Sequence, residues 1–169
     1  MNHIKFLKKR IENYLDEQKA RLLSKKQISE RLTFKGFYEE KEDIPESGGV
    51  YAAFAKNSRG QYRLLYIGRA IKTNTLCKRI GEHIAYDHNT EKWMAHYDSE
   101  TETICYSFVE ISDDDITSDV EKVLIHANQP PVNDKHTEEC NINAQFVELT
   151  CTGNIGDMKP YVVKFKDVK

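Results

Sequence analysis

The sequence lacks long apolar runs and carries few cysteines. No apolar run reaches the ~20 residues that a membrane-spanning helix requires. Residues 1–5 show neither the apolar core nor the small-residue cleavage site of an export signal. None of its four cysteines belongs to a CxxC pair; they are Cys77, Cys105, Cys140 and Cys151. Thiols in such a chain stay reduced and are mostly buried, so we expect a cytoplasmic protein.

Motifs of several common metal and nucleotide sites are absent as well. Gly68-Arg69-Ala70 lacks the Gly-Lys-Ser/Thr end of a phosphate-binding P-loop. The run Asp113-Asp114-Asp115 lacks the alternating spacing and distal Glu of an EF-hand, and is typical of an acidic turn. Two histidines and two cysteines fit no standard zinc-finger spacing, namely His126, His136, Cys140 and Cys151. These absences argue against P-loop, EF-hand and zinc-finger proteins.

The chain does have enough apolar residues for one core, beneath a well-charged surface. Hydrophobic residues make up 39% of the 169 positions and charged residues 31%, which fits one domain with terminal additions. The net charge of −2 counts against non-specific binding to nucleic acid. The first 35 residues, however, carry ten basic and four acidic side chains, a net +6 that leaves −8 for the rest.

The basic N-terminal segment supports two interpretations. It can contact nucleic-acid phosphates from an otherwise acidic body, or it can be a solvated helix whose charges only keep it in solution. For the first interpretation, the candidate DNA-binding residues are Lys8, Lys9, Arg10, Lys25 and Lys26 of this segment, together with Lys78 further along the chain. The charge pattern alone leaves both open.

Hydrophobic periodicity predicts the order of the secondary structure. Apolar residues recur near helical spacing without Pro or Gly over 4–32, which predicts one long helix or two short ones. A connector containing Gly36 and Pro45 follows, over 33–47. Strands and helices are predicted beyond it: a hairpin of 48–56 and 62–67, a helix over 75–87, a short helix capped by Thr90 that runs through Trp93 and Tyr97, a strand over 103–111, a helix over 117–128, and a terminal hairpin of 145–151 and 161–165.

Five short segments in the middle of the chain carry the chemistry. They contain two tyrosines, basic groups, an imidazole, a carboxylate and an amide: Gly49-Val50-Tyr51, Tyr66-Ile67-Gly68-Arg69-Ala70, Arg79 with His83, Glu121 with Leu124-Ile125, and Pro130-Pro131-Val132-Asn133. Such a set suits cleavage of a phosphodiester with one divalent metal ion. Each member alone has an ordinary structural explanation, so the inference depends on the whole set.

The order and spacing of these segments resemble the GIY-YIG nuclease family. Residues 48–134 carry the resemblance, with Val50 in place of the first motif's Ile and the second motif intact. The resemblance implies an α+β fold with a three-stranded antiparallel sheet flanked by helices, here with an added N-terminal helix and a C-terminal β-hairpin. We therefore divide the chain into a basic helical extension and connector (1–47), a nuclease core (48–134) and a C-terminal extension packed on the core (135–169).

The two motif tyrosines are candidate proton-transfer groups. Adjacent strands bring Tyr51 and Tyr66 together at the sheet edge, where a nearby cation can lower a phenol's pKa from about 10 enough to orient or deprotonate water. Tyrosine is also an ordinary half-buried strand residue, so either one alone is better explained by packing. The accompanying Gly49 and Gly68 favour a site, because glycine lets a backbone or a phosphate approach closely.

Basic side chains of the second motif and of the next predicted helix are candidate phosphate-binding and proton-transfer groups. Arg79 and His83 are four residues apart, so they project from the same helical face and can meet one phosphate. An arginine contacts phosphate bidentately and a histidine carries a proton near neutral pH. Two polar residues on an exposed helix face are the simpler alternative. The resemblance assigns both to the catalytic set, together with Arg69 as a ligand of the phosphate or leaving group.

Glu121 is the strongest single candidate, as the ligand of a metal ion. Mg²⁺ is often bound by few carboxylates, with water and phosphate completing its shell. Glu121 precedes Leu124 and Ile125 by one helical turn, at the rim of the buried face, where an unpaired carboxylate is costly. A solvated helix edge is the alternative. The resemblance makes Asn133 a residue that orders the site by hydrogen bonds, although a turn-forming Asn after Pro-Pro is equally ordinary.

The resemblance implies hydrolysis of phosphodiester bonds in DNA with one Mg²⁺ or Mn²⁺ ion. In that scheme Tyr51, helped by His83 or Tyr66, positions and deprotonates the attacking water. Glu121 holds the metal ion, and the arginines neutralise developing charge. A restriction-type endonuclease on double-stranded DNA is the leading expectation, with specificity supplied by the two extensions and by assembly as a homo-oligomer.

Two other classes of function remain open from the sequence alone. A non-catalytic nucleic-acid-binding module on the same fold would bind DNA without Glu121 and give no metal-dependent product. A protein-assembly domain built on the N-terminal helix would form oligomers without affinity for DNA, which suits the acidic body better. The complete set of catalytic side chains favours the enzyme over both.

Overall fold

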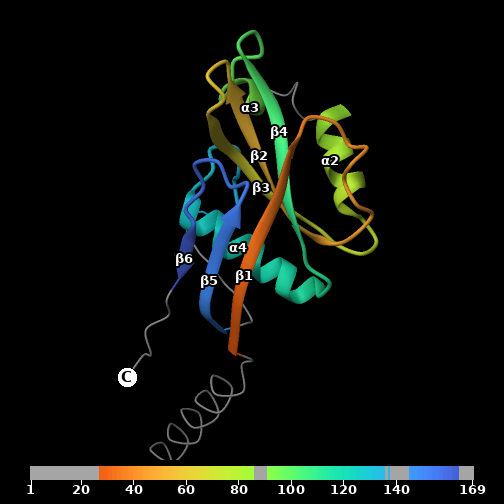
Figure 1. Cartoon of the computed structure of the whole chain (residues 1–169), viewed down its shortest axis with the longest axis vertical. Coiled ribbons are helices and arrows are strands. Elements are labelled where there is room, and N and C mark those ends of the chain that lie inside the picture. The colour runs from red at the N-terminus through yellow and green to blue at the C-terminus, as the bar shows by residue number, and fades with distance from the viewer. Residues whose placement is uncertain (1–26, 86–90, 136, 138–144, 164–169) are drawn as a thin grey trace, which may run out of the picture.

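The computed structural model describes residues 27–85, 91–135, 137 and 145–163, which form an α+β arrangement around one six-stranded mixed sheet (Figure 1). The strand order is β3-β2-β4-β1-β5-β6. The strands are β1 (Gln27–Tyr38), β2 (Gly49–Asn57), β3 (Tyr62–Ala70), β4 (Glu102–Glu110), β5 (Gln145–Gly153) and β6 (Tyr161–Val163). The helices are α2 (Leu76–Ala85), α3 (Glu91–Met94) and α4 (Asp114–Asn128). In the described part of the chain, no helix is long and apolar enough to cross a bilayer.

Strands β3-β2-β4 are paired antiparallel, with β2 bonded to both neighbours, but they are part of a larger, mixed sheet and not the separate three-stranded antiparallel sheet that was expected. The turn between β2 and β3 is closed by Asn57, whose side-chain oxygen accepts hydrogen bonds from the backbone N–H groups of Arg59 and Gln61, both at 3.0 Å. The predicted hairpin and the predicted strand over 103–111 are therefore confirmed, with β3 continuing three residues further, to Ala70.

The prediction for the N-terminal part of the chain is wrong where the structure describes it. Residues 27–32 were expected in a helix and 33–38 in a connector, but all of them lie in β1. The remainder of the predicted helix lies outside the described residues. So do five of the candidate DNA-binding residues: Lys8, Lys9, Arg10, Lys25 and Lys26.

The side chains of β1 explain why a strand forms there. From 31 to 35 they alternate between exposed and less exposed, with Leu32 and Phe34 in the core, which is the period of a strand. One end of β1 pairs antiparallel with β4, and the other pairs parallel with β5. The register of the antiparallel ladder shifts between Lys35 and Tyr38, where Gly36 has a φ of 71°. Long-range pairing therefore overrides the helical spacing of the sequence.

The C-terminal extension forms the predicted hairpin, because β5 and β6 pair antiparallel. Its connecting loop reaches β3, at the other end of the strand order. The backbone N–H of Leu64 donates to the Asp157 carboxylate at 2.6 Å, and the N–H of Asp157 donates to the Tyr62 carbonyl at 3.1 Å. The sheet thus curls, so that the loop between β5 and β6 covers part of the edge of β3.

Helix α4 begins three residues before the predicted start at 117 and ends as predicted at Asn128. Asp113 is its N-cap and accepts hydrogen bonds from the backbone N–H groups of Asp115 and Ile116. The helix stops where Gln129 takes a left-handed conformation ahead of Pro130. Helices α2 and α3 fall within predicted helices, and the expected cap Thr90 lies outside the described residues.

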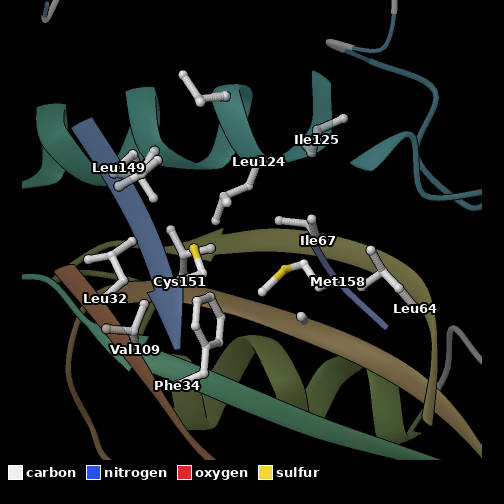
Figure 2. Packing of buried hydrophobic residues seen from close by; sticks show 14 of the residues in the cluster. Leu32, Phe34, Leu64, Ile67, Val109, Leu124, Ile125, Leu149, Cys151 and Met158 are labelled. Carbon is white, nitrogen blue, oxygen red and sulfur yellow. The ribbon is translucent and has the colours of Figure 1, made fainter. Parts of the chain in front are cut away.

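Two hydrophobic clusters cover the two faces of the central sheet. In one, Leu124 and Ile125 of α4 pack against side chains of β1, β3, β4 and β5, as Figure 2 shows. In the other, Leu76 and Ile80 of α2 and Trp93 of α3 pack on the opposite face. Because strand side chains alternate, β2 sends Val50 and Phe54 to the first cluster, and Tyr51 and Ala53 to the second.

The described cysteines are free thiols, as expected. Cys105 and Cys151 are completely buried, and this burial raises the pKa of each thiol to about 12. Cys77 is partly exposed, and Cys140 lies outside the described residues.

Candidate active site

A cavity of about 410 Å³ lies beside β3, the strand at one edge of the sheet. It is lined by nine residues from β3, α3, α4 and the segment that follows α4: Tyr66, Arg69, Lys92, Glu121, Ile125, Val132, Asn133, Asp134 and Lys135. Four of them are predicted site residues, namely Tyr66, Arg69, Glu121 and Asn133. Its size is within the range of pockets that bind small ligands.

Behind Tyr66 lies a cluster of buried aromatic and imidazole rings. The Tyr51 hydroxyl and His83 Nε2 are hydrogen bonded at 2.8 Å, and both residues are buried. The Tyr66 ring centre is 6.1 Å from that of Tyr51 and 5.2 Å from that of His83. Trp93 packs against both Tyr66 and His83, at 5.6 Å from each ring. Tyr66 lines the cavity, whereas Tyr51 and His83 reach it only through Tyr66.

The glycines of the two tyrosine motifs make room for backbone and ring. A Cβ on Gly68 would lie 2.5 Å from both the Cζ and the hydroxyl oxygen of Tyr51. A Cβ on Gly49 would lie 2.1 Å from the Val109 carbonyl oxygen of β4. Gly68 therefore admits the Tyr51 hydroxyl beside β3, while Gly49 serves the close packing of two strands.

Burial shifts the proton affinity of two predicted site residues in the same direction. The pKa of Tyr51 is well above its usual value, mainly because the ring is buried; Tyr66 adds to the shift and the positive charge of Arg79 opposes it. Burial also raises the pKa of the Glu121 carboxyl, against the opposing charges of Arg69, Lys122 and Arg79. The folded protein thus disfavours the negative charge on both groups, and an added cation would favour it.

Glu121 and Arg69 form an ion pair in the wall of the cavity. Glu121 Oε2 lies 3.4 Å from Arg69 Nε, and the side chains are 14% and 42% exposed respectively. The arginine belongs to β3 and the glutamate to α4, so packing of α4 on the sheet creates the pair. A carboxylate that is nearly buried, paired with one cation and open to a cavity can exchange that partner for a metal ion.

Arg79 occupies a different position from Arg69. Its Nη1 lies 2.7 Å from Glu82 Oε2 within α2, and it does not line the cavity. Its charge nevertheless acts on both Tyr51 and Glu121, as the pKa shifts of those residues show. Lys78, one turn away from Glu82 on the same helix, is exposed.

Asn133 is fixed to the edge of β3 by both ends of its amide. The backbone N–H of Ile67 donates to Asn133 Oδ1 at 2.9 Å, and Asn133 Nδ2 donates to the Ile67 carbonyl at 2.8 Å. The N–H of Val132 donates to the Leu65 carbonyl at 3.0 Å. The segment after Pro130-Pro131 thus pairs with β3 as a further strand would, and builds one wall of the cavity.

The residues of the cavity suit a metal ion that takes one carboxylate ligand from the protein and its other ligands from water and a substrate phosphate. Among the described residues, no three or more His, Cys, Asp or Glu side chains are grouped so as to hold a metal ion. Mg²⁺ commonly takes one or two carboxylates, with waters and substrate phosphates as its other ligands. Glu121, whose negative charge is disfavoured by burial, is a fitting carboxylate for such an ion.

Several cavity residues were not predicted from the amino-acid sequence. Lys92, Asp134 and Lys135 line the cavity, and Lys92 Nζ forms an ion pair with Asp134 Oδ2. Trp93 was expected in a short helix, but its packing against Tyr66 and His83 was not. The proximity of Asp134 to Asn133 in the chain is the one hint that the sequence offers.

A scan against models of protein families, a search of curated proteins and a search of solved structures found no match to this chain. Its function therefore has to be inferred from the residues of the cavity and from their geometry.

Proposed function

We propose that the chain is a metal-dependent endonuclease that hydrolyses phosphodiester bonds in DNA, with a core of the GIY-YIG type. One observation carries the proposal: a single cavity gathers Tyr66 and Arg69 with Glu121 and Asn133, which come from three separate sequence motifs. The antiparallel unit β3-β2-β4 within the six-stranded mixed sheet is compatible with such a core. Restriction-type cutting of duplex DNA is the specific activity that we propose.

Arg69 and Glu121 serve the phosphate end of the reaction. The half-exposed guanidinium of Arg69 can bind a phosphate oxygen and offset charge that develops in the transition state. Glu121 is the residue that would hold Mg²⁺ or Mn²⁺, and it would give up part of its pairing with Arg69 to do so. A bound ion would supply Lewis-acid stabilisation of the phosphate and of the leaving oxygen.

Tyr66, Tyr51 and His83 serve the proton-transfer end. Because Tyr66 lines the cavity and Tyr51 is completely buried, we assign contact with the attacking water to Tyr66. Tyr66 would give its hydroxyl proton to the Tyr51 oxygen as it takes one from the water, and Tyr51 would give its own proton to His83 Nε2, to which it is hydrogen bonded. The charge of Arg79 partly offsets the burial that raises the pKa of Tyr51, and Asn133 holds the cavity wall in position.

The experiment is cleavage of supercoiled plasmid and genomic DNA with Mg²⁺ or Mn²⁺, using the unmodified protein and Glu121→Gln. We expect metal-dependent products that a chelator abolishes, and a loss of rate of about 10³-fold or more in the variant. We also expect Mn²⁺ to raise the melting temperature of the unmodified protein but not of Glu121→Gln, because only the former has the anionic ligand.

Glu110→Gln is the matched control, because Glu110 is an exposed glutamate on β4 that pairs with Lys35 and does not line the cavity. This variant should cut DNA as the unmodified protein does. Full cleavage by Glu121→Gln would remove Glu121 from the reaction. DNA binding without cleavage under any metal condition would favour a binding module over an enzyme.

A further inference from the structure

An ion pair in the cavity lies outside the catalytic set. Lys92 Nζ pairs with Asp134 Oδ2, and the two side chains are 40% and 78% exposed. Both residues line the cavity that contains Arg69 and Glu121. Exposed ion pairs of this kind contribute little to stability, so opening this one costs the fold little. Its position in the cavity calls for another explanation.

The backbones on both sides of the pair are held by the site itself. Trp93, the residue after Lys92, packs 5.6 Å from the rings of Tyr66 and His83. Asn133, the residue before Asp134, is hydrogen bonded at both ends of its amide to Ile67. The backbones of Lys92 and Asp134 are thus held next to the catalytic side chains. Only the side chain of Lys92 or of Asp134 has to move for the ion pair to open.

The charges of the cavity point to an anionic ligand larger than one phosphate. Three cations line it, and two of them are paired with its two carboxylates, Arg69 with Glu121 and Lys92 with Asp134. A nucleic-acid strand carries one negative charge per nucleotide. If Arg69 and the metal ion serve the phosphate that is cleaved, a neighbouring phosphate needs a cation of its own.

We propose that Lys92 binds a phosphate next to the one that is cleaved, and that Asp134 occupies Lys92 until a nucleic-acid strand displaces it. This inference rests on the proposed function for the choice of ligand. Asp134 then acts as a built-in competitor: a single phosphate-like anion gains little from opening the pair, whereas a strand that is also held at Arg69 gains enough. Asp134 thereby favours polynucleotide over isolated anions.

The test measures binding of a fluorescein-labelled DNA duplex by anisotropy over a series of salt concentrations, with a chelator present so that no DNA is cut. Lys92→Gln should weaken binding about tenfold at low salt and reduce the salt slope by about 0.9, the value for one phosphate that is no longer neutralised. Asp134→Asn should strengthen binding several-fold. In the Lys92→Gln background, Asp134→Asn should have a much smaller effect, because its competitor role is gone.

The matched control is the exposed pair of Lys56 and Glu39, whose charged atoms lie 3.3 Å apart and which does not line the cavity. Lys56→Gln should leave the salt slope unchanged. The inference is overturned if Lys92→Gln keeps the full slope, if Asp134→Asn acts equally in both backgrounds, or if the unmodified protein binds no duplex.

The outcome is separable from that of the cleavage experiment. Binding that depends on Lys92 in a protein that cuts no DNA supports the phosphate contact and contradicts the hydrolytic function. If cleavage depends on Glu121 but DNA binding does not depend on Lys92, the hydrolytic function is supported and the phosphate contact is contradicted.

Discussion

At the residue scale, the site depends on how closely the Tyr51 ring approaches the backbone of β3. The ring is completely buried and its hydroxyl bonds to His83, so its position is set by packing rather than by solvent. Gly68 leaves the space that the ring end fills. The glycine of the second motif is therefore required for the tyrosine of the first motif to pack in this position.

Gly68→Ala should displace the Tyr51 ring and break its bond to His83. The added Cβ would lie 2.5 Å from the Tyr51 hydroxyl, and overpacking of this kind costs about 1–3 kcal/mol. We expect a lower free energy of unfolding in urea and a loss of cleavage that exceeds the loss of folded protein.

Gly81→Ala, in α2, is the control for that change. The nearest atom to its Cβ would be Lys41 Cδ at 3.4 Å, and alanine is favoured over glycine within a helix by about 0.5–1 kcal/mol. This variant should be more stable and equally active. Equal stability of the two variants would contradict the packing that we describe around Tyr51.

At the element scale, two side chains from separate segments, one after α4 and one between β5 and β6, cap the edge of β3. Asn133 bonds to Ile67, and Asp157 accepts from the N–H of Leu64. An uncovered strand edge is prone to pair with other chains. The two residues perform the same structural task, but only Asn133 lines the cavity.

Asn133→Ala and Asp157→Ala should therefore cost similar stability and differ in activity. Each leaves the N–H of a buried residue without its acceptor, which costs about 1–3 kcal/mol. Chemical denaturation should show the matched destabilisation of the two variants.

Cleavage measured well below the melting temperature separates the two roles. Asp157→Ala should retain most of its rate, whereas Asn133→Ala should lose it because a cavity wall is released. If both variants cut DNA at the same rate, Asn133 is a strand cap alone.

At the scale of the whole molecule, positive charge is concentrated in the first 35 residues and the rest of the chain is net negative. If this segment contacts DNA, changing Lys8, Lys9 and Arg10 to Glu should weaken duplex binding and flatten its dependence on salt. The slope should fall by about 0.9 for each phosphate that the segment no longer neutralises. Anisotropy titrations at several salt concentrations measure both quantities.

The control for this experiment changes the same residue types elsewhere. Lys41, Lys72 and Arg59 are exposed and do not line the cavity. Changing these three to Glu should lower the affinity slightly through net charge and leave the slope nearly intact. An unchanged slope in the N-terminal variant would assign that segment to packing or assembly.

The sequence by itself determined the β2–β3 hairpin, the third strand and the helix that carries Glu121. These depend on local period, on turn residues such as Asn57 and on the stop at Pro130, all of which act over a few residues. The neighbourhood of Tyr51 and Tyr66 follows from the same hairpin, because a short turn fixes which strands are adjacent. The sequence was therefore sufficient to name four of the nine residues that line the cavity, namely Tyr66, Arg69, Glu121 and Asn133.

Only the tertiary structure decided the rest. The strand β1 forms because it pairs with β4 and β5, which lie far away in the chain, and the short alternation over 31–35 does not reveal those partners. The meeting of Arg69 with Glu121, and of Lys92 with Asp134, depends on how α4, α3 and the segment after Pro130 pack around the edge of β3. Side-chain periodicity assigns a residue to a face of its own element, but packing determines which faces share a cavity.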